Sequence, residues 1–162
     1  RNKNISIYFG VNLSESSRVS ENNEIELTLD FLDKKLENSD ILIFKPHPRD
    51  SRGKILSISE KIREKYSIDV LILDEYQYIP AELIILKLIS INCKFQNLFC
   101  FSTLAISLVW LFNYNVSFGF GKIRIKKFFH KKFRNNILNM EKDMNKIIEN
   151  YKNDINNNTN PK

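Results

Sequence analysis

Short runs of consecutive apolar residues alternate along the chain with longer segments in which apolar positions recur every three or four residues. The consecutive runs predict β-strands that are covered on both faces, and they lie at residues 5–9, 41–44, 70–73, 98–101 and 115–118. The periodic segments predict helices with a buried face, and they lie at residues 21–36, 53–66, 80–91, 103–112 and 137–151. Because strands and helices alternate, the sequence predicts an α/β fold, a Rossmann-like parallel sheet with helices on both faces.

Local signals refine this prediction at three places. Ser20 is suited to cap the first helix, with Glu21 in its first turn, and Pro80 is suited to the first position of the third helix. That helix, 80–91, is apolar almost all round, which predicts deep packing. The apolar run 98–112 is shorter than the ~20 residues that a membrane-spanning helix needs, and it predicts a buried strand, a polar turn and a buried helix.

The chain has 162 residues, of which 43% are hydrophobic and 27% charged. This composition fits a single domain that folds without disulfides or metals. We expect residues 1–155 to form one domain and residues 156–162 an unpacked polar tail. Since the sequence opens directly on a strand, we expect the chain to be part of a larger protein, cut at a domain boundary. Two cysteines, Cys93 and Cys100, lie in apolar surroundings and predict buried free thiols in a reducing cytoplasm.

The net charge of +6 is concentrated in one segment, residues 122–134. Such a segment is either a solvated basic face or a surface that contacts anionic lipid or an anionic acceptor. Phenylalanines interleave with its lysines, so a non-enzymatic binding module that stacks on nucleic acid is a third interpretation. No RNA-binding motif accompanies them, and we expect no nucleic acid partner.

The ends of the predicted strands carry the candidate chemistry, because ligands of parallel sheets bind beyond the carboxyl ends of the strands. After the strand 41–44 follows a Lys-Pro-His-Pro-Arg loop in which two prolines fix the backbone around His47. Lys45 and Arg49 flank this histidine; they would favour its neutral form and attract an anion. His47 is therefore either a phosphate ligand and general acid or an ordinary turn residue.

Two further strand ends add groups that suit a nucleotide. Glu82 begins the helix at 80–91, where it would either bind ribose hydroxyls or compensate the helix dipole. Ser102 and Thr103 precede the next helix, where they would either bind phosphate or cap the helix. Together with His47 they predict a nucleotide or nucleotide-sugar site. The glycine fingerprint of dinucleotide folds and the phosphate loop of ATPases are both missing from the sequence, which argues against NAD and ATP.

The motifs KPHPR at 45–49, IPAEL at 79–83 and FST at 101–103 resemble the C-terminal, donor-binding half of bacterial sialyltransferases. The resemblance is closest to glycosyltransferase family 52, the lipooligosaccharide sialyltransferases. Capsular polysialyltransferases share the HisPro and paired-hydroxyl elements. The resemblance covers about residues 1–120. It implies that residues 1–155 are the second, nucleotide-sugar-binding domain of a two-domain GT-B glycosyltransferase, whose N-terminal acceptor domain lies outside the chain. It implies inverting transfer of sialic acid from CMP-sialic acid to a lipooligosaccharide or capsular glycan, with no metal or cofactor.

The resemblance also implies roles for individual residues. His47 would contact the CMP phosphate as general acid, with Pro48 as its structural companion. Glu82 would hold the ribose of CMP. Ser102 and Thr103 would be the hydroxyl pair at the phosphate, with threonine where the families usually have a second serine.

The general base is the role that the motifs leave most open. Glu15, in the loop after the first strand, is the local candidate that we name. Related families often place this base in the first domain, so we expect weak or no transfer by this chain alone. The expected location is the cytoplasm, peripheral to the inner face of the bacterial inner membrane. The alternative to a sialyltransferase is another GT-B transferase, namely a CDP-alcohol polymer transferase, a Kdo-type capsule transferase or a family 52 glucosyltransferase.

Overall fold

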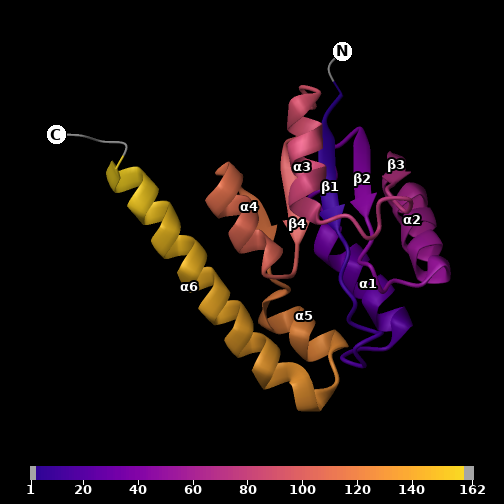
Figure 1. Cartoon of the computed structure of the whole chain (residues 1–162). Coiled ribbons are helices and arrows are strands. Elements are labelled where there is room, and N and C mark those ends of the chain that lie inside the picture. The colour runs from indigo at the N-terminus through magenta and orange to yellow at the C-terminus, as the bar shows by residue number, and fades with distance from the viewer. Residues whose placement is uncertain (1–2, 159–162) are drawn as a thin grey trace.

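The computed structural model describes residues 3–158 and alternates strands and helices along the chain (Figure 1). The strands are β1 (Ile5–Phe9), β2 (Ile41–Lys45), β3 (Asp69–Ile72), β4 (Asn97–Cys100) and β5 (Val116–Phe118). The α-helices are α1 (Glu21–Leu32), α2 (Arg52–Tyr66), α3 (Ala81–Ser90), α4 (Leu104–Phe112), α5 (Gly121–Phe128) and α6 (Arg134–Asn158). A 3-10 turn, η1 (Lys131–Phe133), joins α5 to α6.

The strands form one parallel sheet in the order β3-β2-β1-β4-β5. Central strand β1 pairs with both neighbours through Ile7, which lies opposite Ile43 of β2 and Leu98 of β4. The chain moves outward from β1 to β2 and β3, then returns to place β4 on the other side of β1. The α/β, Rossmann-like prediction is thus confirmed, and the order of the strands reverses between β1 and β4, where such sheets bind ligands.

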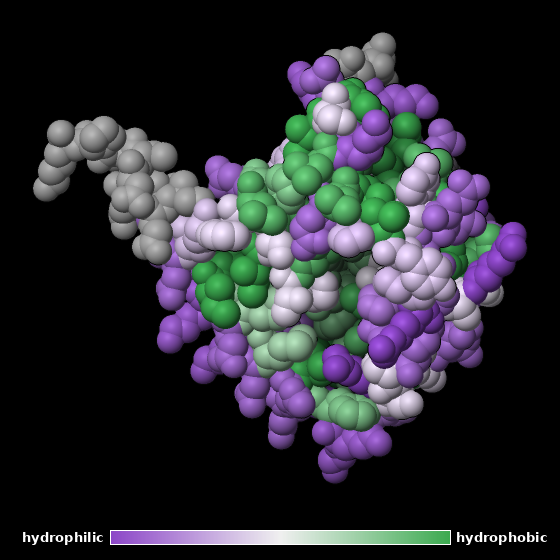
Figure 2. Space-filling view, in the orientation of Figure 1, coloured by the Kyte–Doolittle hydropathy of each residue, from purple (hydrophilic) through white to green (hydrophobic). Residues whose placement is uncertain are grey.

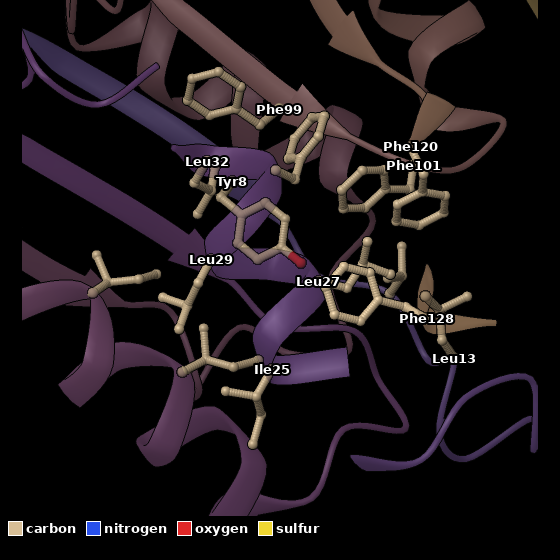
Figure 3. Packing of buried hydrophobic residues seen from close by; sticks show 14 of the residues in the cluster. Tyr8, Leu13, Ile25, Leu27, Leu29, Leu32, Phe99, Phe101, Phe120 and Phe128 are labelled. Carbon is tan, nitrogen blue, oxygen red and sulfur yellow. The ribbon is translucent and has the colours of Figure 1, made fainter. Parts of the chain in front are cut away.

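Two hydrophobic cores lie on opposite faces of the sheet, as alternating side chains require. The first contains Tyr8 and Phe99 of the sheet with residues of α1, α2 and α5. Its aromatic rings pack closely. Tyr8 stacks on Phe44 with ring centroids 5.2 Å apart, and Phe101 stacks on Phe120 at 3.8 Å (Figure 3). The second core joins the other face of the sheet to α3, α4 and α6. The prediction of helices on both faces is confirmed.

Helix boundaries follow the expected signals with small shifts. Ser20 caps α1 and its side chain accepts a hydrogen bond from the backbone N–H of Asn23 at 3.2 Å. This helix ends at Leu32 rather than at residue 36, because the chain turns at Lys34, whose φ is 61°. Leu36 is nevertheless fully buried. Pro80 lies at the N-cap of α3 rather than at its first helical position.

The prediction of deep packing for α3 and α4 is wrong in part. Only Ile84 and Ile85 of α3 are buried, and Trp110 of α4 is 61% exposed. The outward side of these helices carries further exposed apolar residues: Leu83, Leu86, Ile89 and Leu111. Apolar side chains accordingly gather over α3 and α4 on the face shown in Figure 2. The reason is that α6 covers α4 only in part, through Ile148 and Tyr151, and leaves these apolar side chains exposed.

The C-terminal part extends beyond the expected elements. The basic segment 122–134 includes most of α5. The start of α5 is held by Glu141 of α6, which accepts hydrogen bonds from the backbone N–H groups of Phe120 and Gly121. Helix α6 continues to Asn158 and so includes the start of the expected tail at 156–162; the rest of that tail lies outside the described residues. Within residues 3–158, no helix has both the length and the apolar character needed to cross a membrane.

Candidate functional site

A cavity of about 380 Å³ lies at the carboxyl ends of the strands. The loops after β1, β2, β3 and β4 all contribute to its wall, at the point where the order of the strands reverses. It brings together most of the site residues that the sequence predicts: Lys45, His47, Pro48, Glu82, Ser102 and Thr103. Residues from three separate strand ends therefore share one cavity, as the sequence predicts.

His47 is held as a hydrogen-bond donor. Its Nδ1 accepts a hydrogen bond from the backbone N–H of Arg49 at 3.1 Å, so the proton of the neutral ring lies on Nε2. Burial, followed by the positive charges of Arg49 and Lys45, lowers the pKa of His47 below its ordinary value. At neutral pH the side chain is an uncharged imidazole with an Nε2–H that can be donated to an anion.

The loop at residues 45–49, here called the HisPro loop, has its backbone fixed from two sides. Asp50 Oδ2 accepts a hydrogen bond from the N–H of His47 at 2.8 Å. Gln77 Nε2 donates to the carbonyl oxygen of His47 at 2.7 Å and to that of Asp50 at 3.1 Å. Gln77 belongs to the loop between β3 and α3, so these bonds join that loop to the loop after β2.

Lys45 supplies positive charge at the cavity wall. It ends β2 and is 5% exposed, and its Nζ donates to the carbonyl oxygens of Gln77 at 2.7 Å and Pro46 at 3.1 Å. Burial lowers the pKa of Lys45 below its ordinary value, although the nearby charge of Asp50 opposes the shift. The ammonium is thus solvated by carbonyl groups beside His47, where it favours an anionic ligand.

The other side of the cavity offers hydroxyls and a carboxylate. Glu82 lies in the first turn of α3. Ser102 Oγ accepts a hydrogen bond from the N–H of Leu104 at 3.3 Å, whereas Thr103 at the N-cap of α4 makes no capping bond through its side chain. The Thr103 hydroxyl is exposed at the cavity. Ser107, one turn further along α4, also lines the cavity and was not predicted.

Two predicted site residues lie outside this cavity. The side chain of Arg49 is exposed, and its contact with His47 is made by its backbone. Glu15 forms an ion pair with Lys54 at 2.8 Å. Partial burial alone would raise the pKa of Glu15, but hydrogen bonds led by that from Lys54 lower it below its ordinary value. The ion pair occupies one oxygen of the Glu15 carboxylate, and the role of Glu15 as general base remains a prediction.

Glu15 belongs to a charged cluster that sequence reasoning missed, in which Glu24, Asp50 and Lys54 are buried and Glu15 is exposed. Oxygen atoms of Glu15, Glu24 and Asp50 all lie within 4.8 Å of one another, as ligands of a metal ion would. The ammonium of Lys54 lies among them and pairs with all three carboxylates. The signal for Lys54 was its position on the same side of α2 as Ile55, Ile58 and Ile62, where a charge needs partners. The expectation that the site needs no metal remains a prediction.

The basic segment 122–134 presents its lysines to solvent. Phe128 and Phe129 within it are 6% and 1% exposed and belong to the first core, so neither ring can stack on a nucleic acid base. Arg124 forms an ion pair with Asp30 of α1. The exposed cations of the segment are Lys122, Lys126, Lys127, Lys131 and Lys132.

Comparison with protein-family models gives a match to the model for alpha-2,8-polysialyltransferase (POLYST) over residues 2–92. Fold and family together define a glycosyltransferase of the sialyltransferase type. The match covers more than half of the 162 residues, and the chain belongs to the alpha-2,8-polysialyltransferase family. Membership implies in general a nucleotide-sugar donor and a glycan acceptor. No curated protein and no solved structure matches the chain.

The family match bears on the predicted resemblance in two ways. It supports the sialyltransferase class, through the polysialyltransferases that share the motifs, and it does not extend to family 52, which the motifs suggested as closest. The matched residues include His47 and Glu82 but end before Ser102 and Thr103. The predicted role of Ser102 and Thr103 at the phosphate therefore rests only on their position in the cavity.

Proposed function

We propose that this chain is the donor-binding domain of a sialyltransferase that transfers sialic acid, with inversion, from CMP-sialic acid to a cell-surface glycan such as lipooligosaccharide or capsule. The observation that carries this proposal is that His47, Glu82 and the hydroxyls at 102–103 line one cavity. Family membership supplies the reaction class. We place the activity in the cytoplasm, where free thiols such as those of Cys93 and Cys100 persist.

The cavity suits a nucleotide monophosphate in size and in the placement of its polar groups. Its volume of about 380 Å³ falls within the usual range for small-molecule sites. The phosphate would lie between the Nε2–H of His47 and the Thr103 hydroxyl, near the N-terminus of α4. The ribose hydroxyls would donate hydrogen bonds to Glu82. Lys45 would offset the phosphate charge from the cavity wall.

The transfer would proceed by displacement at the anomeric carbon. The acceptor hydroxyl oxygen forms a bond to this carbon while the bond from the carbon to the CMP phosphate oxygen breaks, and the electron pair leaves with the phosphate. His47 and the hydroxyls stabilise the charge that grows on the phosphate, so we propose no metal or cofactor. The proton of the acceptor hydroxyl must go to a base, and Glu15, one oxygen of which is paired with Lys54, remains the predicted candidate.

Calorimetric titration of CMP, CMP-sialic acid, CDP and UDP into the chain tests this proposal. We expect selective binding of CMP and CMP-sialic acid. His47→Ala should weaken CMP binding by about tenfold to a hundredfold, because it removes a hydrogen bond to a charged group. Ser102→Ala should weaken it by roughly twofold to tenfold.

Matched controls separate the cavity from general effects of substitution. His130→Ala removes the other histidine, which is exposed outside the donor cavity, and Ser90→Ala removes an exposed serine at the end of α3. Both should bind CMP like the unmodified chain. Tighter binding of CDP would favour a CDP-alcohol polymer transferase, and tighter binding of UDP a glucosyltransferase. A folded chain that binds no nucleotide would refute the proposal.

We also propose that the basic segment 122–134 contacts an anionic membrane surface or glycan. Its lysines are exposed beside Ile123, which is 83% exposed on α5. Each lysine near an anionic membrane contributes about 1 kcal/mol. Co-sedimentation should show binding to phosphatidylglycerol vesicles and not to phosphatidylcholine vesicles.

A charge-matched pair of variants tests that surface. Replacing Lys122 and Lys126 with glutamine should weaken vesicle binding by about thirtyfold, since each lysine contributes about 1 kcal/mol. Replacing Lys142 and Lys146, two exposed lysines of α6, should leave most of it. Equal loss in both variants would show that net charge alone governs binding, and the assignment to this segment would be wrong.

A further inference from the structure

The ammonium of Lys54 lies among carboxylates from three parts of the chain. Its Nζ lies 2.7 Å from Asp50 Oδ1, 2.8 Å from Glu15 Oε2 and 3.1 Å from Glu24 Oε2. Asp50 precedes α2, Glu15 lies in the loop after β1, and Glu24 lies in α1. The Lys54 side chain is fully buried. A buried charge is stable only when it is paired, so these contacts are required by the fold.

Two of these carboxylates also hold backbone N–H groups of the strand-end loops. Asp50 uses its second oxygen to accept from the N–H of His47 at 2.8 Å. Glu24 accepts from the N–H of Ser14 at 2.7 Å and from that of Leu13 at 3.3 Å. Lys54 is thus connected to the loop after β1 through Glu24 and to the HisPro loop through Asp50.

The charges in the cluster are unequal in number. Three carboxylates surround one ammonium, and removal of the ammonium would leave three acidic groups with oxygens within 4.8 Å of one another. Burial already raises the pKa of Asp50 to about 6, although its contacts with Lys54 oppose that shift. Without Lys54, Asp50 would be the carboxylate most prone to move or to take up a proton. Either change alters its bond to the N–H of His47.

We propose that Lys54 is a positioning residue of the donor site: its ammonium holds Asp50 in place, and Asp50 fixes the backbone of His47 at the cavity. Lys54 does not line the cavity and so acts through Asp50 rather than on the ligand. The relevance of Lys54 to catalysis rests on the proposed function, but its effect on the HisPro loop does not depend on that function.

Amide hydrogen exchange of the nucleotide-free chain tests the proposal. Lys54→Met should speed exchange at the His47 amide by about tenfold or more, as expected for loss of a hydrogen bond to a charged group. The acceleration should exceed the change at core amides such as Ile7, because a general loss of stability would act on the core as well. Unchanged exchange at His47 in folded Lys54→Met, or acceleration no greater than in the core, would overturn the proposal.

Lys61→Met is the matched control. Lys61 also lies on α2 and also pairs with α1, through Glu26 at 3.0 Å, but both side chains are about half exposed. Exchange at His47 should be unchanged in this variant. If Lys54→Met does not fold, Asp50→Asn carries the test, since it keeps the shape of the side chain and removes the charge. His47 should again exchange faster, and normal protection in folded Asp50→Asn would contradict the proposal.

Titration of CMP then separates this inference from the proposed function. We expect Lys54→Met to weaken CMP binding by about tenfold and Lys61→Met to leave it unchanged. Failure of the unmodified chain to bind CMP would refute the proposed function while the exchange result still decides whether Lys54 positions the loop. Full CMP affinity in Lys54→Met would overturn the positioning role at the donor site.

Discussion

Gly10 lies so close to His47 that a Cβ atom on Gly10 would stand 3.0 Å from the backbone nitrogen of His47. The same Cβ atom would stand 2.9 Å from Asp50 Oδ2, the oxygen that accepts the His47 N–H bond. The end of β1 therefore approaches the HisPro loop more closely than any side chain allows. Glycine at position 10 is what permits the loops after β1 and β2 to meet at the cavity.

Gly10→Ala should destabilise the fold and weaken nucleotide binding. We expect a loss of about 1–3 kcal/mol in the free energy of unfolding, as for other overpacked sites. Denaturant unfolding measures it. Gly53→Ala is the control, because a Cβ atom on Gly53 meets nothing within 4 Å. In the second position of α2 that change should be neutral or stabilising by up to about 1 kcal/mol. Equal stability of both variants would contradict the close approach.

Gln77→Ala should loosen the HisPro loop from the other side. The substitution removes donors to the carbonyl oxygens of His47 and Asp50, and we expect a loss of about 1–2 kcal/mol in stability together with weaker CMP binding. Gln96→Ala serves for comparison, since exposed Gln96 donates only to Asn4 Oδ1 among side chains, at the opposite edge of the sheet. CMP affinity that stays intact in Gln77→Ala would show that the loop does not need this support.

His47 should titrate below its ordinary pKa of 6.5, because burial and neighbouring cations disfavour its charged form. The unfolded chain then takes up this proton at a higher pH than the folded chain. The neutral imidazole contributes stability above pH 6.5, and that contribution is lost as the pH falls through the lower pKa of the folded state. NMR titration of the ring protons measures the shift, and His47→Gln should lack this part of the pH dependence. An imidazole that titrates at or above 6.5 would contradict the assignment.

Cys100 should resist alkylation while Cys93 reacts. Cys100 is fully buried in β4, and burial raises the pKa of its thiol to about 12, so almost none is present as reactive thiolate. Cys93 is only partly buried, which corrects the expectation that both thiols are buried. Mass mapping after iodoacetamide treatment should find label at Cys93 first, and at both positions once the chain is denatured. Equal rates in the folded chain would refute this.

The sequence predicts the strands and the cavity residues well because these depend on local patterns. His47 closely follows the strand β2, Glu82 lies in the first turn of the helix after β3, and parallel strands bring their carboxyl ends to one edge of the sheet. The Lys54 cluster could not be predicted in this way. It pairs Lys54 with carboxylates that lie 39 positions earlier, at Glu15, and in α1, at Glu24, and such pairing is decided by how the helices pack.

The exposure of α3 and the ion pair of Glu15 escaped prediction for similar reasons. An apolar helix predicts burial, but whether another layer covers its outward side, as at Leu83 and Leu86, depends on what packs there. Glu15 does follow the first strand, as a candidate base should. Its pairing with Lys54 joins residues far apart along the chain, and that contact is not visible in the sequence.

A crystal structure of the chain with CMP would test the central claim most directly. The account predicts that the phosphate lies within hydrogen-bond distance of His47 Nε2 and of a hydroxyl of Ser102 or Thr103, with the ribose at Glu82. The HisPro loop should keep its bonds to Asp50 and Gln77. CMP bound elsewhere, for example on the basic segment 122–134, or bound in the cavity with its phosphate away from His47, would contradict the account.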